Sequence, residues 1–177
     1  FPKRPKNETY EANEFSTVLN ACGRHGRVDV GLRVCMGDES AYAEGRALLQ
    51  QHRRMLKQGI EFALGKVQDL GRFYFLDGRG VVDEGIIGIV CGMVLRQSWT
   101  KPMIGISLGE NDTVKVSGRA PRPLVEAGMN LGEMMKTAAS EVGGIGGGHR
   151  IAAGASIPKD SVNEFLLAAG HYFRLIT

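Results

Sequence analysis

A glycine-rich run near the end of the chain constrains the fold more than any other segment. Residues 143–155 read GGIGGGHRIAAGA, so this stretch has few bulky side chains to fill a core. Glycine leaves backbone N–H groups accessible, and such groups can converge on an anion. His149 and Arg150 follow directly and can both contact phosphate. The run therefore predicts a phosphate-binding loop with His149 at its edge.

Two better-known glycine motifs do not fit this run. The dinucleotide-binding pattern G-x-G-x-x-G would need glycine where the chain has His149. A Walker A loop needs Lys and then Ser or Thr after its last glycine, but Gly148 is followed by His149 and Arg150. A helix C-cap is the structural alternative, and it would account for Gly143 but not for the remaining glycines.

A second candidate element is the alternating segment 114–119, which predicts a strand. Val114 and Val116 would face a core, so Lys115, Ser117 and Arg119 would share the opposite face. A hydroxyl and a guanidinium on one strand face suit phosphate oxygens. The alternative is an ordinary solvated strand face, and the pattern alone favours that alternative.

These residues resemble a known family. Residues 146–149 (GGGH) with 151–154 (IAAG) resemble the signature of the DHHA1 domain, the C-terminal module of the DHH phosphoesterase superfamily. Residues 114–119 are similar to a Ser-x-Arg strand of the same domain, and residues 20–24 (NACGR) resemble a motif of RecJ-type nucleases. The three motifs stand in the same order as in the family. Together they resemble the C-terminal half of an archaeal RecJ-like single-stranded-DNA-specific exonuclease.

The resemblance implies a role for each site residue. His149 would approach the scissile phosphate, where it could stabilise developing charge or donate a proton. Asn20 would organise the residues around it. Arg24 would contact phosphate, and the alternative for Arg24 is to cap the C-terminus of the preceding helix. The phosphate- and nucleic-acid-binding residues that it implies are Arg24, Ser117, Arg119, Gly146, Gly147, Gly148, Arg150 and Asn20.

One departure from the family concerns the metal site. No Asp-His-His motif occurs in the chain, which begins at Phe1. We therefore expect a substrate-binding fragment that is inactive alone and carries no metal ligands or cofactor. The Mn²⁺ or Mg²⁺ of the full-length enzyme would be bound by sequence outside this chain.

Composition limits the cellular setting. No apolar run approaches the roughly 20 residues that a membrane-spanning helix needs, so we expect no membrane partner. Cys22, Cys35 and Cys91 are odd in number and far apart, which argues against a disulfide framework and for a reducing cytoplasm. Cys22 and His25 have a C-x-x-H spacing without a second ligand pair, so buried or idle thiols are favoured over zinc. A net charge of +3 tolerates a polyanion without proving that one binds.

The expected fold is α/β, a mixed β-sheet with packed helices, preceded by a long helical connector. Residues 1–68 would form the connector and the tail of the DHH half, with Asp38 capping a long amphipathic helix. Residues 69–177 would form the DHHA1-like domain. Its expected strands are 73–76, 103–108, 114–119 and 151–157, and its expected helices are 83–97, one after Asn130 and one after Ser161.

Single-stranded nucleic acid is the expected substrate, with DNA repair and replication as the setting. Tyr74 and Trp99 are aromatic candidates for base stacking, although a core role is favoured for Tyr74. A phosphoesterase acting on very short oligonucleotides or on a 3′,5′-bisphosphonucleotide is the enzymatic alternative. A non-catalytic docking module is the third possibility, because archaeal relatives associate with the replication complex GINS.

Overall fold

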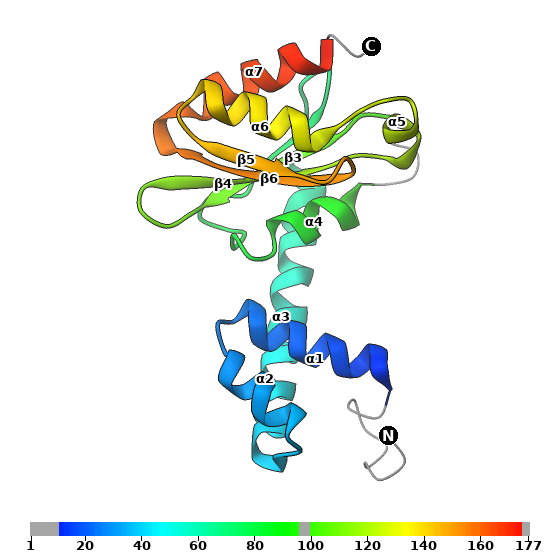
Figure 1. Ribbon diagram of the computed structural model, residues 1–177, viewed down its shortest axis with the longest axis vertical. Coiled ribbons are helices and arrows are strands. Elements are labelled where there is room, and N and C mark those ends of the chain that lie inside the picture. Colours follow the sequence, from blue (N-terminus) through cyan, green and yellow to red (C-terminus); the bar gives the residue numbers. More distant parts are fainter. Residues whose placement is uncertain (1–10, 96–99, 175–177) are drawn as a thin grey trace. The chain divides into compact units, whose positions relative to one another are not determined.

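The computed structural model describes residues 11–95 and 100–174 (Figure 1). The chain divides into two compact units, Phe1–Lys57 and Gln58–Thr177. Each unit is described by itself below. Trp99, a candidate for base stacking, lies outside the described residues.

The N-terminal unit is helical. It contains α1 (Ala12–Arg24), α2 (Val28–Cys35) and the first part of α3 (Glu39–Lys66). Asp38 begins α3 as predicted, because its Oδ1 accepts hydrogen bonds from the backbone N–H groups of Ser40 and Ala41 at 2.9 and 3.1 Å. The small core of this unit consists of Val18, Ala21, Cys22, Val30, Val34, Ala41 and Leu49.

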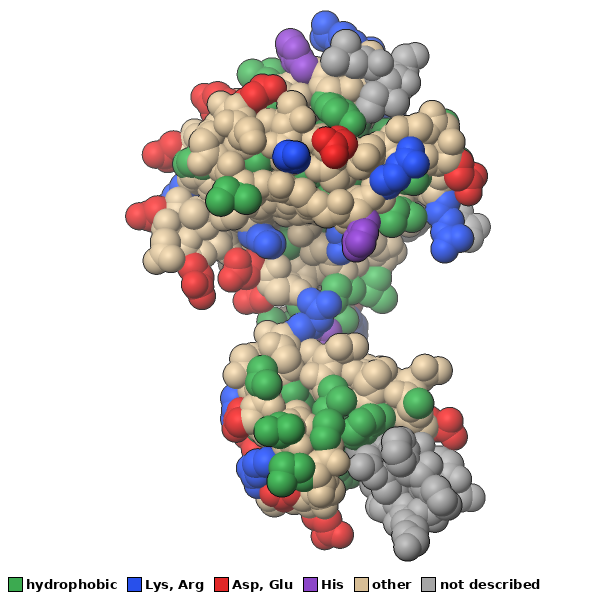
Figure 2. Space-filling model, in the orientation of Figure 1, with side chains coloured by type: hydrophobic (Ala, Val, Ile, Leu, Met, Phe, Trp, Pro, Cys, Tyr) green, Lys and Arg blue, Asp and Glu red, His purple; other side chains and the backbone are tan. Residues whose placement is uncertain are grey.

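Apolar side chains also remain exposed on this unit. Figure 2 shows hydrophobic side chains on its visible face, and Val28, Leu32 and Met36 are each more than half exposed. These three residues recur every four positions along and just after α2, so they share one side of that helix.

The C-terminal unit is built on a six-stranded sheet in the order β1-β2-β3-β4-β6-β5. Only β2 and β3 pair in parallel, which makes the sheet mixed, as predicted. The strands are β1 (Gln68–Asp69), β2 (Tyr74–Asp77), β3 (Met103–Leu108), β4 (Thr113–Arg119), β5 (Ile145–Gly148) and β6 (Ala152–Pro158).

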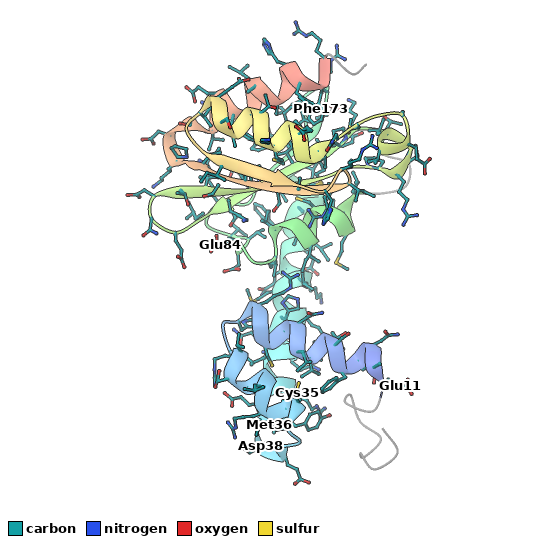
Figure 3. The ribbon with its side chains drawn as sticks, viewed as in Figure 1. Glu11, Cys35, Met36, Asp38, Glu84 and Phe173 are labelled. Carbon is teal, nitrogen blue, oxygen red and sulfur yellow. The ribbon has the colours of Figure 1, made fainter. Side chains whose placement is uncertain are left out.

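Helices cover the two faces of this sheet unequally. The helices α6 (Leu131–Glu141) and α7 (Val162–Arg174) lie on one face, and α4 (Ile87–Val94) lies on the other (Figure 1). The main core lies under α6 and α7, where Phe173 points from α7 towards the sheet and its ring stands 5.7 Å from that of Phe73 (Figure 3). Val114 and Val116 face this core, as the alternation predicted.

The glycine-rich run forms an edge strand rather than a loop. Gly143 ends α6 with a φ of +74°, which is the C-cap role expected for it. The next residues extend as β5, whose edge is left unpaired. A β-carbon on Gly146 would overlap the carbonyl oxygen of Met135, and one on Gly132 would overlap that of Gly148. Part of the run is therefore glycine because the backbones of α6 and β5 lie in contact, which the sequence did not reveal.

The other expected elements are confirmed with shifted ends. The helix expected over 83–97 begins only at Ile87, because Asp83 accepts a hydrogen bond from the N–H of Gly85 and forms a turn. Asn130 caps α6 through the N–H of Glu133. The short β1 and α5 (Arg122–Glu126) were not predicted. A domain boundary between residues 68 and 69 stays a prediction.

Candidate nucleic-acid interface

Three small residues form a row across the sheet face that lies opposite α6 and α7. Ser117 on β4 pairs with Gly154 on β6, and Gly154 pairs with Gly147 on β5. Paired residues of an antiparallel ladder point to the same side. Alternation along β4 assigns that side, since Val116 and Gly118 pack against α6 and its neighbours. At Gly154 and Gly147 this face therefore presents bare backbone, while Ile145, two positions before Gly147, is exposed on the same side.

Arg119 and His149 lie at the ends of the neighbouring row. Arg119 pairs with Ala152, and the N–H of His149 donates to the carbonyl oxygen of Ala152 at 3.0 Å. This bond extends the ladder one pair past β5, so alternation directs His149 to the same side as Arg119. Two strand spacings separate them, roughly 10 Å between backbones. His149 is exposed.

The helix α4 holds the side chains of Ser117 and Arg119. A β-carbon on Gly88 would lie 2.7 Å from Nη2 of Arg119 and 3.1 Å from Oγ of Ser117, and one on Gly92 would lie 3.6 Å from Nε of Arg119. Arg119 is half-buried and its Nη1 donates to the carbonyl oxygen of Gly118 at 2.7 Å, while Ser117 is 8% exposed. The alternative of a solvated strand face is thus wrong for these two residues.

Two glycines one turn apart make this contact possible. Without side chains at Gly88 and Gly92, the guanidinium of Arg119 can lie against the backbone of α4. Burial raises the pKa of the nearby Cys91 thiol to about 12, and the charge of Arg119 opposes that rise only in part. The residue therefore remains a neutral, structural thiol.

The predicted glycine residues have different neighbours. Gly146 faces α6, and Gly148 has a φ of +138° with Ala153 2.7 Å from its would-be β-carbon. Gly147 alone of the three has no atom within 4 Å of that position. Among Gly146, Gly147 and Gly148, only Gly147 is therefore open to a ligand on the row described above.

Arg150 is directed elsewhere. Its Nη2 donates to the carbonyl oxygen of Val125 at 3.4 Å, and its own carbonyl accepts from the N–H of Leu131. These bonds tie the β5–β6 turn to the segment around α5 and the start of α6. The structure does not bring the Arg150 side chain to the row of Arg119 and His149.

Arg24 and Asn20 belong to the N-terminal unit. Both are exposed and lie one turn apart on α1. Their grouping with Ser117 and Arg119 stays a prediction. Arg24 and His25 lower the pKa of His52, although burial of that ring is the larger cause. The rings of His25 and His52 meet edge to face with centroids 6.0 Å apart.

The described residues do not fit a metal centre. Across 11–95 and 100–174, no three His, Cys, Asp or Glu side chains are grouped so that they could hold an ion. We derive no metal-dependent step from them. Over the same residues, no helix is long and apolar enough to span a bilayer.

Basic side chains do not form one large patch on the face of the C-terminal unit that Figure 2 shows. Figure 2 shows Lys and Arg in small separate groups on the visible face of the C-terminal unit, with acidic side chains among them. On this face, affinity for a polyanion would have to come from individual contacts rather than from a broad positive field. Tyr74 is half-buried and has Lys101 Nζ 5.5 Å from its ring centroid, in keeping with a structural role.

Residues 72–174 match the DHHA1 domain. The chain belongs to the DHHA1 domain family. The matched range includes β2 to α7 and with them Ser117, Arg119 and His149. An uncharacterised protein of Methanocaldococcus jannaschii is 35% identical over 161 residues, which are 91% of this chain and 35% of that protein. The chain thus spans about a third of the length of this relative.

Solved structures share the DHHA1 fold with this chain. RecJ from Thermus thermophilus, in complex with Mn²⁺, matches with a TM-score of 0.74 at 18% sequence identity. The match covers 92% of this chain and 24% of the RecJ chain. CDC45 from Entamoeba histolytica matches with a TM-score of 0.54 at 13% sequence identity. That match covers 89% of this chain and 37% of the CDC45 chain. At these identities the likeness is one of fold.

Proposed function

We propose that this chain is the substrate-binding part of a RecJ-like single-strand-specific exonuclease. The observation that carries the proposal is the row that runs from Arg119 through Ala152 to His149, beside the bare backbone at Gly154 and Gly147. A cation, an open strip of backbone and an exposed imidazole in this order suit a sugar–phosphate chain that crosses the sheet.

Each group has a distinct part in this proposal. Arg119 offers its guanidinium to phosphate oxygens, and the hydroxyl of Ser117 adds a short hydrogen bond. Gly147 and Gly154 let the strand approach the sheet, because no side chain stands between them. His149, at the exposed end, stabilises the charge that develops on the phosphoryl group or donates a proton to the leaving oxygen.

The complete enzyme would hydrolyse phosphodiester bonds with Mn²⁺ or Mg²⁺ bound outside this chain, where the metal would supply the activated water. Arg24 of the N-terminal unit would also contact phosphate, and Asn20 would organise the residues around it. We assign the protein to the cytoplasm and to DNA repair or replication. Cys22 and Cys91, which are buried without a disulfide, are compatible with that compartment.

Equilibrium binding tests the proposal. A fluorescein-labelled oligothymidylate should bind more tightly than a duplex of equal length, and log affinity should fall with log salt by about 0.7 per phosphate contact. Arg119→Lys should keep part of the affinity, since a point charge replaces only part of the fork. An affinity that does not depend on salt concentration, or that is higher for the duplex, would contradict the proposed interface.

The length of the oligonucleotide separates the enzymatic alternatives. In a groove for long strands, affinity rises as nucleotides are added. In a phosphoesterase for very short oligonucleotides or for a 3′,5′-bisphosphonucleotide, affinity reaches its maximum within the first few nucleotides. The likeness of fold to CDC45 favours a second candidate, docking on a replication complex such as GINS. Retention of purified GINS by this chain, and its loss in variants that still bind strands, would support that candidate.

A further inference from the structure

A groove lies on the opposite side of the sheet from Arg119 and His149. It encloses about 490 Å³ between α7 and the segment that links β1 to β2. This volume is within the range of roughly 300–1,000 Å³ in which proteins hold compact ligands. Its lining residues are Leu70, Arg72, Phe73, Asn163, Leu166, Leu167, Gly170, His171 and Arg174.

The groove combines an apolar floor with a basic rim. Phe73 is buried at its base, whereas Leu70 and Leu167 are 43% and 67% exposed. Two arginines and one histidine line it, and none of its lining residues is acidic. His171 and Arg174 lie in the last turn of α7, where helix-end electrostatics favours cations, and Arg72 comes from the β1–β2 segment.

The helix α7 carries two separate faces. Its buried face packs Val162, Phe165, Ala169 and Phe173 into the core. The groove residues of α7 recur at the spacing of a second stripe, from Asn163 through Leu167 and Gly170 to Arg174. This second stripe borders the groove, and Leu167 on it is largely exposed.

A glycine in the interior of α7, Gly170, borders the groove. A β-carbon on Gly170 would meet only Cε1 of Phe73 at 3.9 Å, and its φ is not positive. Alanine there would favour the helix by about 1 kcal/mol. Neither packing nor backbone geometry requires glycine at this position, so the open space is a feature that the fold alone does not explain.

We propose that this groove binds an acidic peptide segment of a partner protein, with a large apolar side chain over Gly170 and Phe73. Carboxylates on either side of that side chain would pair with Arg72 and Arg174, as charge complementarity requires. A nucleic-acid strand is less suited, because the ring of Phe73 at the base of the groove is buried and offers no open face on which a base could stack. The proposal does not depend on the single-strand interface.

A random-peptide phage library, selected on the 177-residue chain, tests the proposal. The enriched sequences should place Asp or Glu beside Leu, Phe or Trp, and a fluorescent copy of the strongest peptide should then bind in solution. Absence of enrichment, or enrichment of sequences without acidic residues, would overturn the proposal.

Two matched pairs of variants locate the binding. Gly170→Leu fills the groove and Gly170→Ala does not, so only the leucine variant should lose the peptide. Arg174→Glu should lower the affinity for the peptide by about tenfold or more. Lys136→Glu, an equal charge change on α6 outside the groove, should leave that affinity unchanged. Circular dichroism spectra would establish that all four variants fold.

Competition distinguishes this proposal from the single-strand interface. Oligothymidylate should not displace the peptide, and Gly170→Leu should bind oligothymidylate as the parent chain does. Displacement of the peptide by the oligonucleotide, or equal peptide binding by the Gly170→Leu and Gly170→Ala variants, would refute an acidic-peptide groove. Failure of oligothymidylate to bind at all would count against the proposed nuclease function and leave this result intact.

Discussion

Replacing Gly88 by alanine would separate the two roles of Arg119, phosphate binding and packing. The added β-carbon would lie 2.7 Å from Nη2 of Arg119, so the guanidinium would have to move. The obstructed atom is the far end of a flexible side chain, so the fold can adapt. Gly88 is the second residue of α4 and its φ is not positive, so alanine strains no backbone there. The free energy of unfolding should therefore stay nearly level.

Strand binding should respond more strongly. A charge-assisted hydrogen bond contributes about 1.5–3 kcal/mol. Displacement of the guanidinium would therefore lower the affinity for oligothymidylate by roughly 10- to 150-fold. Gly92→Ala is the matched control on the same helix. Its β-carbon would lie 3.6 Å from Nε of Arg119, which is ordinary van der Waals contact, and its affinity should match that of the parent.

Fluorescence anisotropy for affinity and urea unfolding for stability would be measured on the same preparations. Arg119→Ala completes the set, and it should lose both affinity and some stability because its stem packs along α4. Equal affinities for the parent, Gly88→Ala and Gly92→Ala would show that Arg119 does not touch the strand. A large loss of stability in Gly88→Ala would refute the geometry from which the prediction starts.

Three further predictions concern packing, catalysis and pH. Gly146→Ala should destabilise the chain by about 1–3 kcal/mol in urea, since the β-carbon meets the backbone of α6, while Gly65→Ala, with nothing within 4 Å, should not. In the complete enzyme, His149→Ala should slow single-turnover cleavage by about 10²–10³-fold at nearly unchanged binding; an equal loss of both would make His149 a ground-state ligand. The folded state lowers the pKa of His52 below 6.5, so the unfolded chain binds more protons and stability should fall as pH drops below about 6.5; the fall should vanish in His52→Gln.

The sequence predicted the sheet more completely than the site. The strand expected over 103–108, the alternation along β4 and the caps at Asp38 and Asn130 depend on local signals, and the structure confirms all four. The strand β5 was missed because glycine has no β propensity and no side chain whose alternation could be counted. Its conformation is fixed by the ladder with β6 and by contact with α6, and both partners are distant in sequence.

The site residues differ in how far local patterns could place them. The common side of Ser117 and Arg119 follows from alternation, and the structure confirms it. Their burial does not follow, because α4 reaches them from a separate part of the chain, and the glycine spacing of Gly88 and Gly92 was the one available sign of a close approach. Arg150 was grouped with His149 by adjacency, yet neighbours in a turn point in different directions, and its side chain bonds to Val125.

Alternation along β5 explains how a single glycine run can serve both the fold and a ligand. Gly146 faces α6, where any side chain would separate helix from sheet, and Gly147 faces the other way, beside Gly154, with free space above it. Gly148 then turns the chain at a φ that disfavours other residues, which brings His149 to the end of the row that Arg119 begins. The helix α6 fixes one face of this strand by backbone contact at Gly146, and the opposite face is bare at Gly147 and carries the exposed Ile145 two positions before it. A bare strip of backbone at Gly147 and Gly154, beside the row from the half-buried Arg119 to the exposed His149, is therefore a consequence of how the sheet packs, and it needs no flexible loop to form.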